Sequence, residues 1–437
     1  MSRLVAYLHR RFSDRKRTNA IVSLANWAAV ASRRRILRQS QTIALEAKSF
    51  ESYYTSIHPA QVASFEALLA EPTRTACVWT PAVSPPVLDH SRIIAIDGVK
   101  QPWFAVTAPI YHPTQQGFLR VPSAIVYPRP GLVMPEPGVV LRNDLLRWVP
   151  DHRLTPGFFD FVDGKLVAQR SELHPRGRIR RTVLVLCHAF HRNYGHWLFD
   201  CLPFLLPWHE LAQQGRLAVL VPPLADWQRR TLELLGVPAS AVIEAAQPSI
   251  FCDDVIVPGL NSTSVETVTQ PNSYFLHQPG PSVIDSIRIL KAGIHAVGPI
   301  HRLERIYVSR HGIESFRYLR NEDEVEAVMM QLGFTVVRPQ ELTFDEQVAT
   351  FACARVIAGP HGAGLTNASF APAGCLVVDI CPDVWASRWM VRLTQLFEHQ
   401  YLPLAYPSNA ELPKPLFADA SIGQTFFYAV QIDESLP

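Results

Sequence analysis

A histidine-rich stretch carries the residue types of general acid–base catalysis. His196 and Asp200 stand four positions apart in a helix that we expect over 194–208, so the two side chains should share one face. A carboxylate in that position can orient and polarise an imidazole, which makes His196 the candidate base and Asp200 its rival. The structural alternative is a histidine packed inside the protein with its carboxylate partner.

The same stretch contains two more histidines, which raises the alternative of a metal-dependent hydrolase. His188 and His191 precede His196, but His191 and His196 are five positions apart, which suits no single helical face. No zinc motif with a carboxylate accompanies them. We therefore expect no metal site.

A glycine-containing turn further along the chain suits a diphosphate. The expected strand 355–360 leads into His361, Gly362, Ala363 and Gly364, and Asn367 follows in the next helix. Glycines between a strand and a helix let the backbone approach a phosphate, and the first N–H groups of the helix favour negative charge. On spacing alone, close packing of helix on strand explains the glycines equally well, and His361 could be structural.

Arginines follow another expected strand, 305–309. Arg310 directly follows the last residue of this strand, and Arg317 and Arg320 come within the next loop. Guanidinium forks bind phosphate oxygens in fixed geometry and can replace a metal. The Asp-x-Asp pair of many metal-bridged sugar-nucleotide sites is absent from the sequence, and we interpret the acids at 322–324 as the first turn of a helix.

The elements that must position these groups alternate between strands and helices. Short, continuous apolar runs typical of buried parallel strands occur at 182–187, 217–221, 254–257, 305–309, 335–337, 356–359 and 376–380. Helical patterns lie between them, and two capping boxes are expected, at Asn321 with Glu324 and at Thr343 with Glu346. The sequence predicts an α/β fold with two units, 46–275 and 276–437, each with a parallel sheet, and a ligand cleft between them.

Composition limits the classes of protein. Of 437 residues, 48% are hydrophobic and 18% charged, so a large core forms and wholesale disorder is excluded. Many of the 36 prolines fall between 72 and 156, where we expect loops. The seven cysteines include no Cys-x-x-Cys pair, which argues against a disulfide framework and favours a reducing, cytoplasmic location.

The first 45 residues form a separate basic, helical arm in this interpretation. Residues 1–38 hold ten Arg or Lys and one acid, a charge of +9 against −6 for the remainder of a chain whose net charge is +3. Such an arm suits an anionic membrane surface, with peripheral attachment, better than nucleic acid, because aromatic residues are few in it. The apolar run 20–31 is too short to span a bilayer, and we expect no signal-peptide cleavage after it.

Several motifs, in order, resemble those of glycosyltransferase family 61. They cover about 180–383 and comprise Asn193-Tyr194-Gly195-His196-Trp197 with Asp200, Ser309-Arg310, Asn321-Glu322, Gly333-Phe334, Phe344-x-Glu346-Gln347 and Pro360-His361-Gly362-Ala363-Gly364-Leu365-Thr366-Asn367. The family includes plant xylosyltransferases and many bacterial proteins linked to capsular polysaccharide.

The resemblance implies a GT-B-like fold of two Rossmann-like lobes facing a cleft, a nucleotide-sugar donor, usually UDP-linked, and inversion at the anomeric carbon. The arginines and the missing Asp-x-Asp pair predict that the transfer needs no metal. Arg310 and Arg317 would hold the diphosphate beside the turn at 361–367, with His196 and Asn193 facing them from the other lobe. The loop 310–321 is longer than in the family pattern, so Arg320 stays an alternative to Arg317. The expected function is sugar transfer to an acceptor hydroxyl in polysaccharide or capsule synthesis. The alternative is a non-catalytic sugar-nucleotide-binding subunit of a polysaccharide assembly complex.

Overall fold

The computed structural model describes residues 42–70, 74–81, 90–94, 115–142, 159–162, 165–169, 174–188, 190–261, 281–295, 303–313, 319, 321–382 and 389–406. The basic residues 1–38, Arg317 and Arg320 lie outside these ranges. Within them, no helix has both the length and the apolar character needed to cross a membrane.

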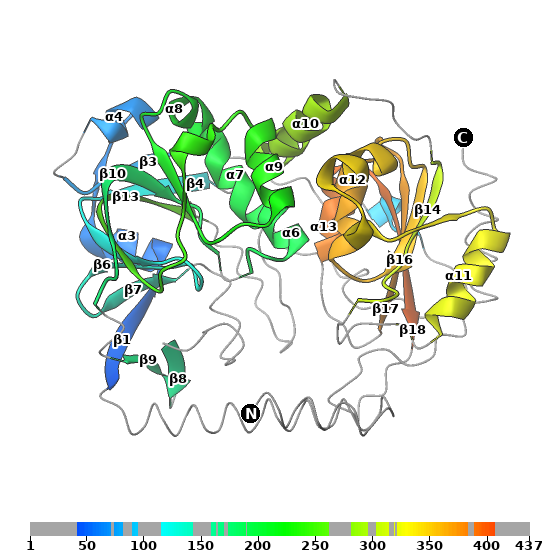
Figure 1. Cartoon of the computed structure of the whole chain (residues 1–437), viewed down its shortest axis with the longest axis horizontal. Coiled ribbons are helices and arrows are strands. Elements are labelled where there is room, and N and C mark those ends of the chain that lie inside the picture. Colours follow the sequence, from blue (N-terminus) through cyan, green and yellow to red (C-terminus); the bar gives the residue numbers. More distant parts are fainter. Residues whose placement is uncertain are drawn as a thin grey trace.

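The first half of the chain builds a mixed sheet, drawn from blue to green in Figure 1. Its strands in the described ranges are β1 (Thr42–Ser49), β2 (Ala60–Gln61), β3 (Ala76–Trp79), β4 (Gln115–Val121), β5 (Ala124–Tyr127), β6 (Leu132–Glu136), β7 (Val139–Arg142), β8 (Phe159–Val162), β9 (Lys165–Gln169), β10 (Arg178–Val185), β11 (Ala218–Val221), β12 (Val242–Glu244) and β13 (Ile250–Asn261).

Only part of this sheet is parallel, so the expectation of a parallel first sheet is correct only in part. Strands β12, β11, β10 and β13 run parallel, whereas β13 pairs antiparallel with β4 and β5. The antiparallel part contains β3 to β7, within the proline-rich stretch where loops were expected. Short turns join β5 to β6 and β6 to β7, and Gly131 and Gly138 supply the positive φ angles there.

The expected helix over 194–208 is instead a series of short turns of changing type. It consists of α6 (Tyr194–His196), a π-helical turn η4 (Trp197–Cys201), α7 (Leu202–Leu205) and η5 (Leu206–Trp208). Pro203 and Pro207 stand at the starts of α7 and η5. Because proline has no N–H, it cannot continue an α-helical ladder, and the helix type changes at these points.

The second half forms a parallel sheet in the order β15-β14-β16-β17-β18. The strands are β14 (Arg305–Val308), β15 (Thr335–Val337), β16 (Val356–Pro360), β17 (Leu376–Pro382) and β18 (Gln400–Tyr406). Helix α11 (Glu322–Gln331) covers one face, while α12 (Phe344–Phe351), η8 (Ala363–Phe370) and α13 (Trp389–Leu396) cover the other. Later strands are added on one side of the neighbours β14 and β16 as β15 and on the other side as β17 and β18, so the direction of the strand order reverses between β14 and β16.

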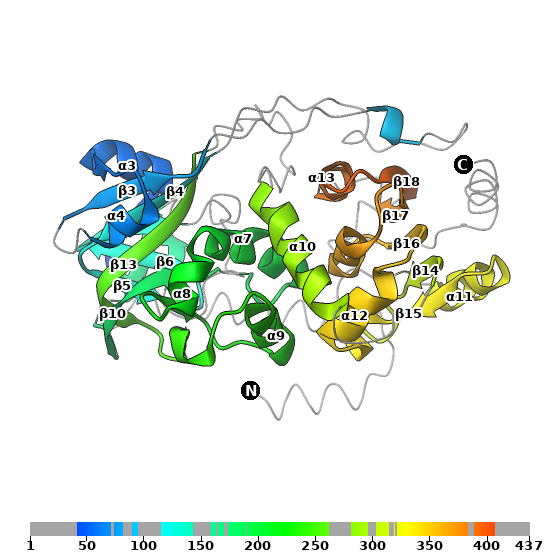
Figure 2. The same ribbon diagram turned by 90° about the horizontal axis from the view of Figure 1, so that it is seen from above.

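Helices join the two sheets into one packed body. Helix α10 (Pro281–His295) contacts α7 and α9 (Asp226–Leu234) of the first half and α12 of the second, and lies between the two halves in Figure 2. One apolar cluster includes side chains from both halves, among them Trp197, Leu202, Leu365 and Met390. Arg230 on α9 also forms a two-pronged ion pair with Asp345 on α12.

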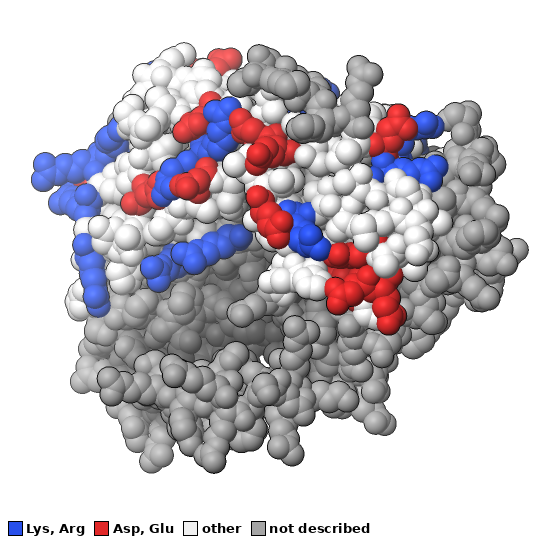
Figure 3. All heavy atoms as spheres, turned by 45° about the vertical axis from the view of Figure 1, so that its right-hand side comes forward, with Lys and Arg blue, Asp and Glu red and all other residues white. Residues whose placement is uncertain are grey.

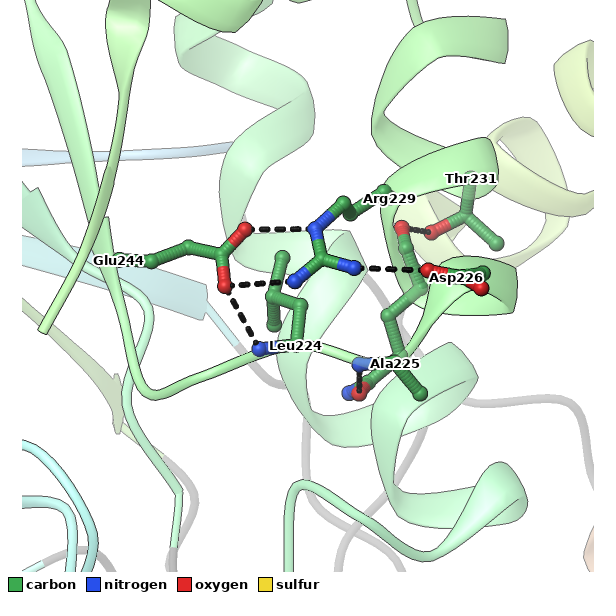
Figure 4. Close-up of polar contacts among 7 residues, drawn as sticks. Leu224, Ala225, Asp226, Arg229, Thr231 and Glu244 are labelled. Carbon is green, nitrogen blue, oxygen red and sulfur yellow. Dashed lines mark hydrogen bonds and ion pairs between the residues drawn. The ribbon is translucent and has the colours of Figure 1, made fainter. Parts of the chain in front are cut away.

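The start of α9 is fixed to the carboxyl edge of the first sheet (Figure 4). Glu244, at the end of β12, accepts hydrogen bonds from the backbone N–H of Leu224 and from the Arg229 guanidinium, which also pairs with Asp226. These contacts hold α9 in position both for the ion pair to the second half and for its support of the segment around His196.

Candidate active site

Arg310 and Gly362 meet where the order of the second sheet reverses. Arg310 follows β14 and Gly362 follows β16, and these two strands are parallel neighbours. A Cβ atom placed on Gly362 would lie 2.2 Å from Arg310 Nη1, so the guanidinium rests directly against the glycine. The carboxyl ends of strands at such a reversal are where open α/β sheets bind ligands. The structure thus brings together the two sequence motifs that we assigned to a diphosphate.

Two buried glutamates of α11 fix the loop that carries Arg310. Glu322 accepts the backbone N–H of Arg310 at 2.6 Å, and Glu326 accepts the Ser309 hydroxyl at 2.5 Å. Burial lowers the pKa of Arg310 and raises the pKa of Glu322. The interpretation of 322–324 as simply an acidic first turn therefore missed Glu322, whose carboxyl group anchors the arginine loop.

The glycines around the turn have different roles. Gly362 is extended, and the space where a Cβ would stand is taken by Arg310. At Gly364 a Cβ would come within 2.9 Å of Val308 Cγ1, so this glycine permits the close packing of η8 on β14. Ala363 and Gly364 are half-buried at the start of η8, where the first N–H groups have no partner within the helix. These groups can serve an anion.

His361 lies beneath this turn and is nearly inaccessible, with 3% of its surface exposed. Its Nδ1 lies 2.9 Å from Asp379 Oδ2, and the same carboxylate accepts the Tyr401 hydroxyl at 2.9 Å. The sequence analysis did not identify Asp379 or Tyr401. The one available signal was an acidic residue at an apolar position of the expected strand 376–380.

His196 and Asp200 form the expected pair. The His196 Nδ1 and Asp200 Oδ2 atoms are 2.6 Å apart, and each side chain is 12% exposed. The pair spans the π-helical turn, a form that occurs often at functional sites. The His196 ring also stacks with Phe190 and His188, with ring centroids 5.0 and 5.5 Å away. An ionised Asp200 accepts a hydrogen bond from Nδ1–H, so the neutral ring carries its lone pair on Nε2.

The other two histidines of this stretch do not assemble a metal site with His196. The backbone N–H of Phe190 donates to His188 Nδ1, and His191 Nδ1 donates to the His188 carbonyl. Burial lowers the pKa of His191, which favours its neutral form. In the part of the chain that the structure describes, no group of three His, Cys, Asp or Glu side chains is placed to hold a metal ion.

The predicted ligand residues Asn193 and Asn367 both serve the protein framework. Asn193 caps α6, since its side-chain oxygen accepts the N–H groups of Gly195 and His196. Asn367 has no exposed surface; its amide accepts the Tyr194 hydroxyl at 2.7 Å and donates to Gln347 at 3.0 Å. This environment favours a structural role for Asn367 over the expected contact with a donor.

The histidine segment and the glycine turn are therefore in direct contact. A Cβ on Gly195 would lie 3.0 Å from Thr366 Oγ1, so α6 packs closely on η8. On the opposite side, α9 supports the same segment through Thr231, which accepts the Trp197 ring N–H, and Gln228, which donates to the His191 carbonyl. Sequence reasoning did not find these two buried residues of α9.

Comparison with protein-family models adds independent evidence. Residues 194–378 match the family described as Glycosyltransferase 61, a span that begins at Tyr194 and includes His196, Arg310 and the turn at 361–367. Residues 194–378 form a glycosyltransferase family 61 domain. The protein is a glycosyltransferase, and as such it requires a nucleotide-sugar donor and an acceptor. A search among curated proteins found no match.

Proposed function

We propose that this glycosyltransferase has a GT-B-like arrangement and transfers a sugar from a UDP-linked donor to an acceptor hydroxyl, with inversion and without a metal. The observation that carries the proposal is the contact of the Arg310 guanidinium with Gly362 at the strand-order reversal. Permanent positive charge and helix N–H groups gather there, as a diphosphate requires.

The residues support a single displacement. The acceptor oxygen bonds to the anomeric carbon while the bond from that carbon to the diphosphate breaks, and the acceptor proton passes to Nε2 of His196. Asp200 holds Nδ1–H and balances the positive charge that the imidazole gains. Arg310 and the start of η8 stabilise the negative charge that develops on the departing UDP. Asp200 is the alternative base.

The donor assignment is tested by two variants that act on one group. Arg310→Ala removes the guanidinium, and Gly362→Ala displaces it without a change of charge, because the new Cβ occupies its space. Both should weaken UDP binding, measured by calorimetry, by about tenfold or more. Gly177→Ala is the control, because its nearest contact would be an ordinary 3.8 Å to Ile250. Unchanged UDP affinity in Arg310→Ala would show that the donor binds elsewhere.

The base and the metal requirement are tested by turnover. His196→Ala should reduce kcat far more than UDP affinity, whereas equal loss of both with a lower melting temperature would indicate a structural histidine. Activity should persist in excess EDTA, since the proposal gives arginines the part that a metal plays elsewhere. Activity that disappears with EDTA and returns with a divalent cation would overturn the metal-independent mechanism.

We further propose that the enzyme acts in polysaccharide or capsule synthesis at the cytoplasmic membrane face, attached through residues 1–38. Figure 3 shows acidic and basic side chains interspersed over the middle of the face that it draws, and such mixed charge does not favour an anionic partner there. The support for an anionic membrane partner comes instead from the basic sequence of residues 1–38. Flotation with anionic vesicles should recover the full chain but not a chain that lacks residues 1–38. Equal recovery of both would place membrane binding elsewhere or exclude it.

A further inference from the structure

Asp379 occupies a position of β17 that the strand pattern reserves for an apolar side chain. Leu376, Val378 and Ile380 face the apolar cluster under α11, whereas Val377 and Cys381 face the cluster under η8 and α13. Asp379 stands between the last two and has no exposed surface. A carboxylate at such a position is costly unless hydrogen-bond donors satisfy it. Its presence in the core therefore indicates a specific task.

Two buried side chains supply those donors. His361 Nδ1 lies 3.1 and 2.9 Å from the two oxygens of Asp379, and the Tyr401 hydroxyl donates to Oδ2 at 2.9 Å. Burial, and then the nearby Asp379, raise the pKa of Tyr401 well above its usual value, so the phenol stays a donor. Because an ionised carboxylate only accepts, the proton of the His361 ring on this side is on Nδ1.

The strand that carries Tyr401 is itself held from outside the second half. Residues 90–94 lie beside β18, where the backbone N–H of Ile94 donates to the Tyr401 carbonyl at 2.8 Å and the Arg92 guanidinium to that of Glu398 at 2.6 Å. Figure 1 shows this short segment, in light blue, among the orange strands. Tyr401 is thus fixed through both its backbone and its hydroxyl.

This network ends at the turn assigned to the donor. His361 immediately precedes Gly362, and its backbone N–H donates to the Ile380 carbonyl at 2.9 Å, so both backbone and ring are restrained. With Nδ1 held by Asp379, the second nitrogen, Nε2, is on the opposite edge of the ring.

We propose that Asp379 and Tyr401 are positioning residues that keep Nδ1–H of His361 directed at Asp379 and fix the ring orientation, so that the doubly protonated ring donates from Nε2–H to the diphosphate of the nucleotide-sugar donor beside Arg310. This inference rests on the proposed function. When Nε2 also carries a proton, it donates to a phosphate oxygen, and the Asp379 carboxylate compensates the positive charge of the ring.

The test combines UDP calorimetry with a spectroscopic readout on the full chain. Asp379→Asn keeps the shape of the side chain but removes its charge, and Tyr401→Phe removes only the hydroxyl. Val377→Ala, on the same strand and face, is the control for a simple loss of core packing. Nitrogen-15 NMR of labelled histidine reports which ring nitrogen of His361 carries the proton, assigned by its disappearance in His361→Gln.

We expect Asp379→Asn to weaken UDP binding about tenfold, the lower end of the losses known for hydrogen-bond partners of metal-ligating histidines, and Tyr401→Phe to weaken it less. Without UDP, the Nδ1–H tautomer should dominate in the wild type and decline in Asp379→Asn. With UDP bound, both ring nitrogens of the wild type should carry a proton. Val377→Ala should change neither the affinity nor the protonation of the ring. In His361→Gln, the further change Asp379→Asn should cost no additional affinity. Additive losses, or wild-type affinity and tautomer in Asp379→Asn and Tyr401→Phe, would overturn the inference.

Failure of the inference can be distinguished from failure of the proposed function. A wild-type chain that binds UDP, together with variants that behave as the wild type, refutes only the role of Asp379 and Tyr401. A folded wild-type chain that binds no UDP refutes the proposed donor and, with it, the diphosphate role of His361.

Discussion

Acidification should destabilise this protein through one buried histidine, His399. Its Nε2–H donates to the Ala368 carbonyl at 2.9 Å near the end of η8, while Nδ1 is buried without a hydrogen-bond partner among the described residues. A second proton on the ring would place a charge in this apolar surrounding. Burial, and the nearby positive charges of Lys291 and Arg92, lower the pKa of His399 from 6.5 to about 4.

The sign and size of the effect follow from linkage between proton binding and folding. Because the unfolded chain binds the proton more tightly, the contribution of His399 is complete above about pH 6.5 and is lost as the pH falls toward 4. The full loss corresponds to about 3 kcal/mol of unfolding free energy, of which about 2.5 kcal/mol is gone by pH 4.5.

The measurement is guanidinium unfolding at pH 7.5 and pH 4.5, followed by tryptophan fluorescence. His399→Gln keeps an N–H donor for the Ala368 carbonyl but does not titrate, so the loss between the two pH values should be smaller than in the wild type by about 2.5 kcal/mol. An equal loss in wild type and His399→Gln would refute the reasoning.

Two further predictions concern the loops that build the site. Tyr194→Phe leaves the buried oxygen of Asn367 without its hydrogen-bond donor and should cost about 1–3 kcal/mol of unfolding free energy. The control Tyr54→Phe, which removes a hydroxyl from a half-buried residue, should cost less. Equal costs would contradict a buried link between the two halves. Glu322→Gln keeps an oxygen that can accept the Arg310 N–H, but it removes a carboxyl group whose pKa is raised in the folded state. Because such a group makes the folded state less stable as the pH rises above 4.5, the melting temperature of the variant relative to the wild type should increase from pH 4 to pH 8. A constant difference between the two proteins would contradict this prediction.

The second half of the fold could be predicted from the sequence because its local signals agree with the tertiary structure. Continuous apolar runs became β14 to β17, and the capping box expected at Thr343 and Glu346 is present. The capping box expected at Asn321 and Glu324 was wrong. Asn321 makes no side-chain cap bond, and its amide donates to Glu324 instead. Strand β18 was missed.

The residues that sequence reasoning missed act over long distances along the chain. Asp379 contacts His361 across 18 positions and Tyr401 across 22, and Arg230 reaches Asp345 across 115. No local pattern encodes these pairs, since each depends on strand order and on the register between strands. The antiparallel strands β3 to β7 were missed for a related reason. Turn residues and prolines dominate their sequence, while their hydrogen-bond partners lie elsewhere.

The contact between α6 and η8 determines how the site can move. Separating the two halves at this point would break the hydrogen bond from the Tyr194 hydroxyl to Asn367. It would also expose Gly195 and Thr366 to water, because these two residues are buried against each other. An unsatisfied buried amide alone costs about 1–3 kcal/mol, before the apolar cluster shared by both halves is opened. Opening this contact is therefore costly, which favours one arrangement of the segment from Asn193 to His196 against the turn at 361–367.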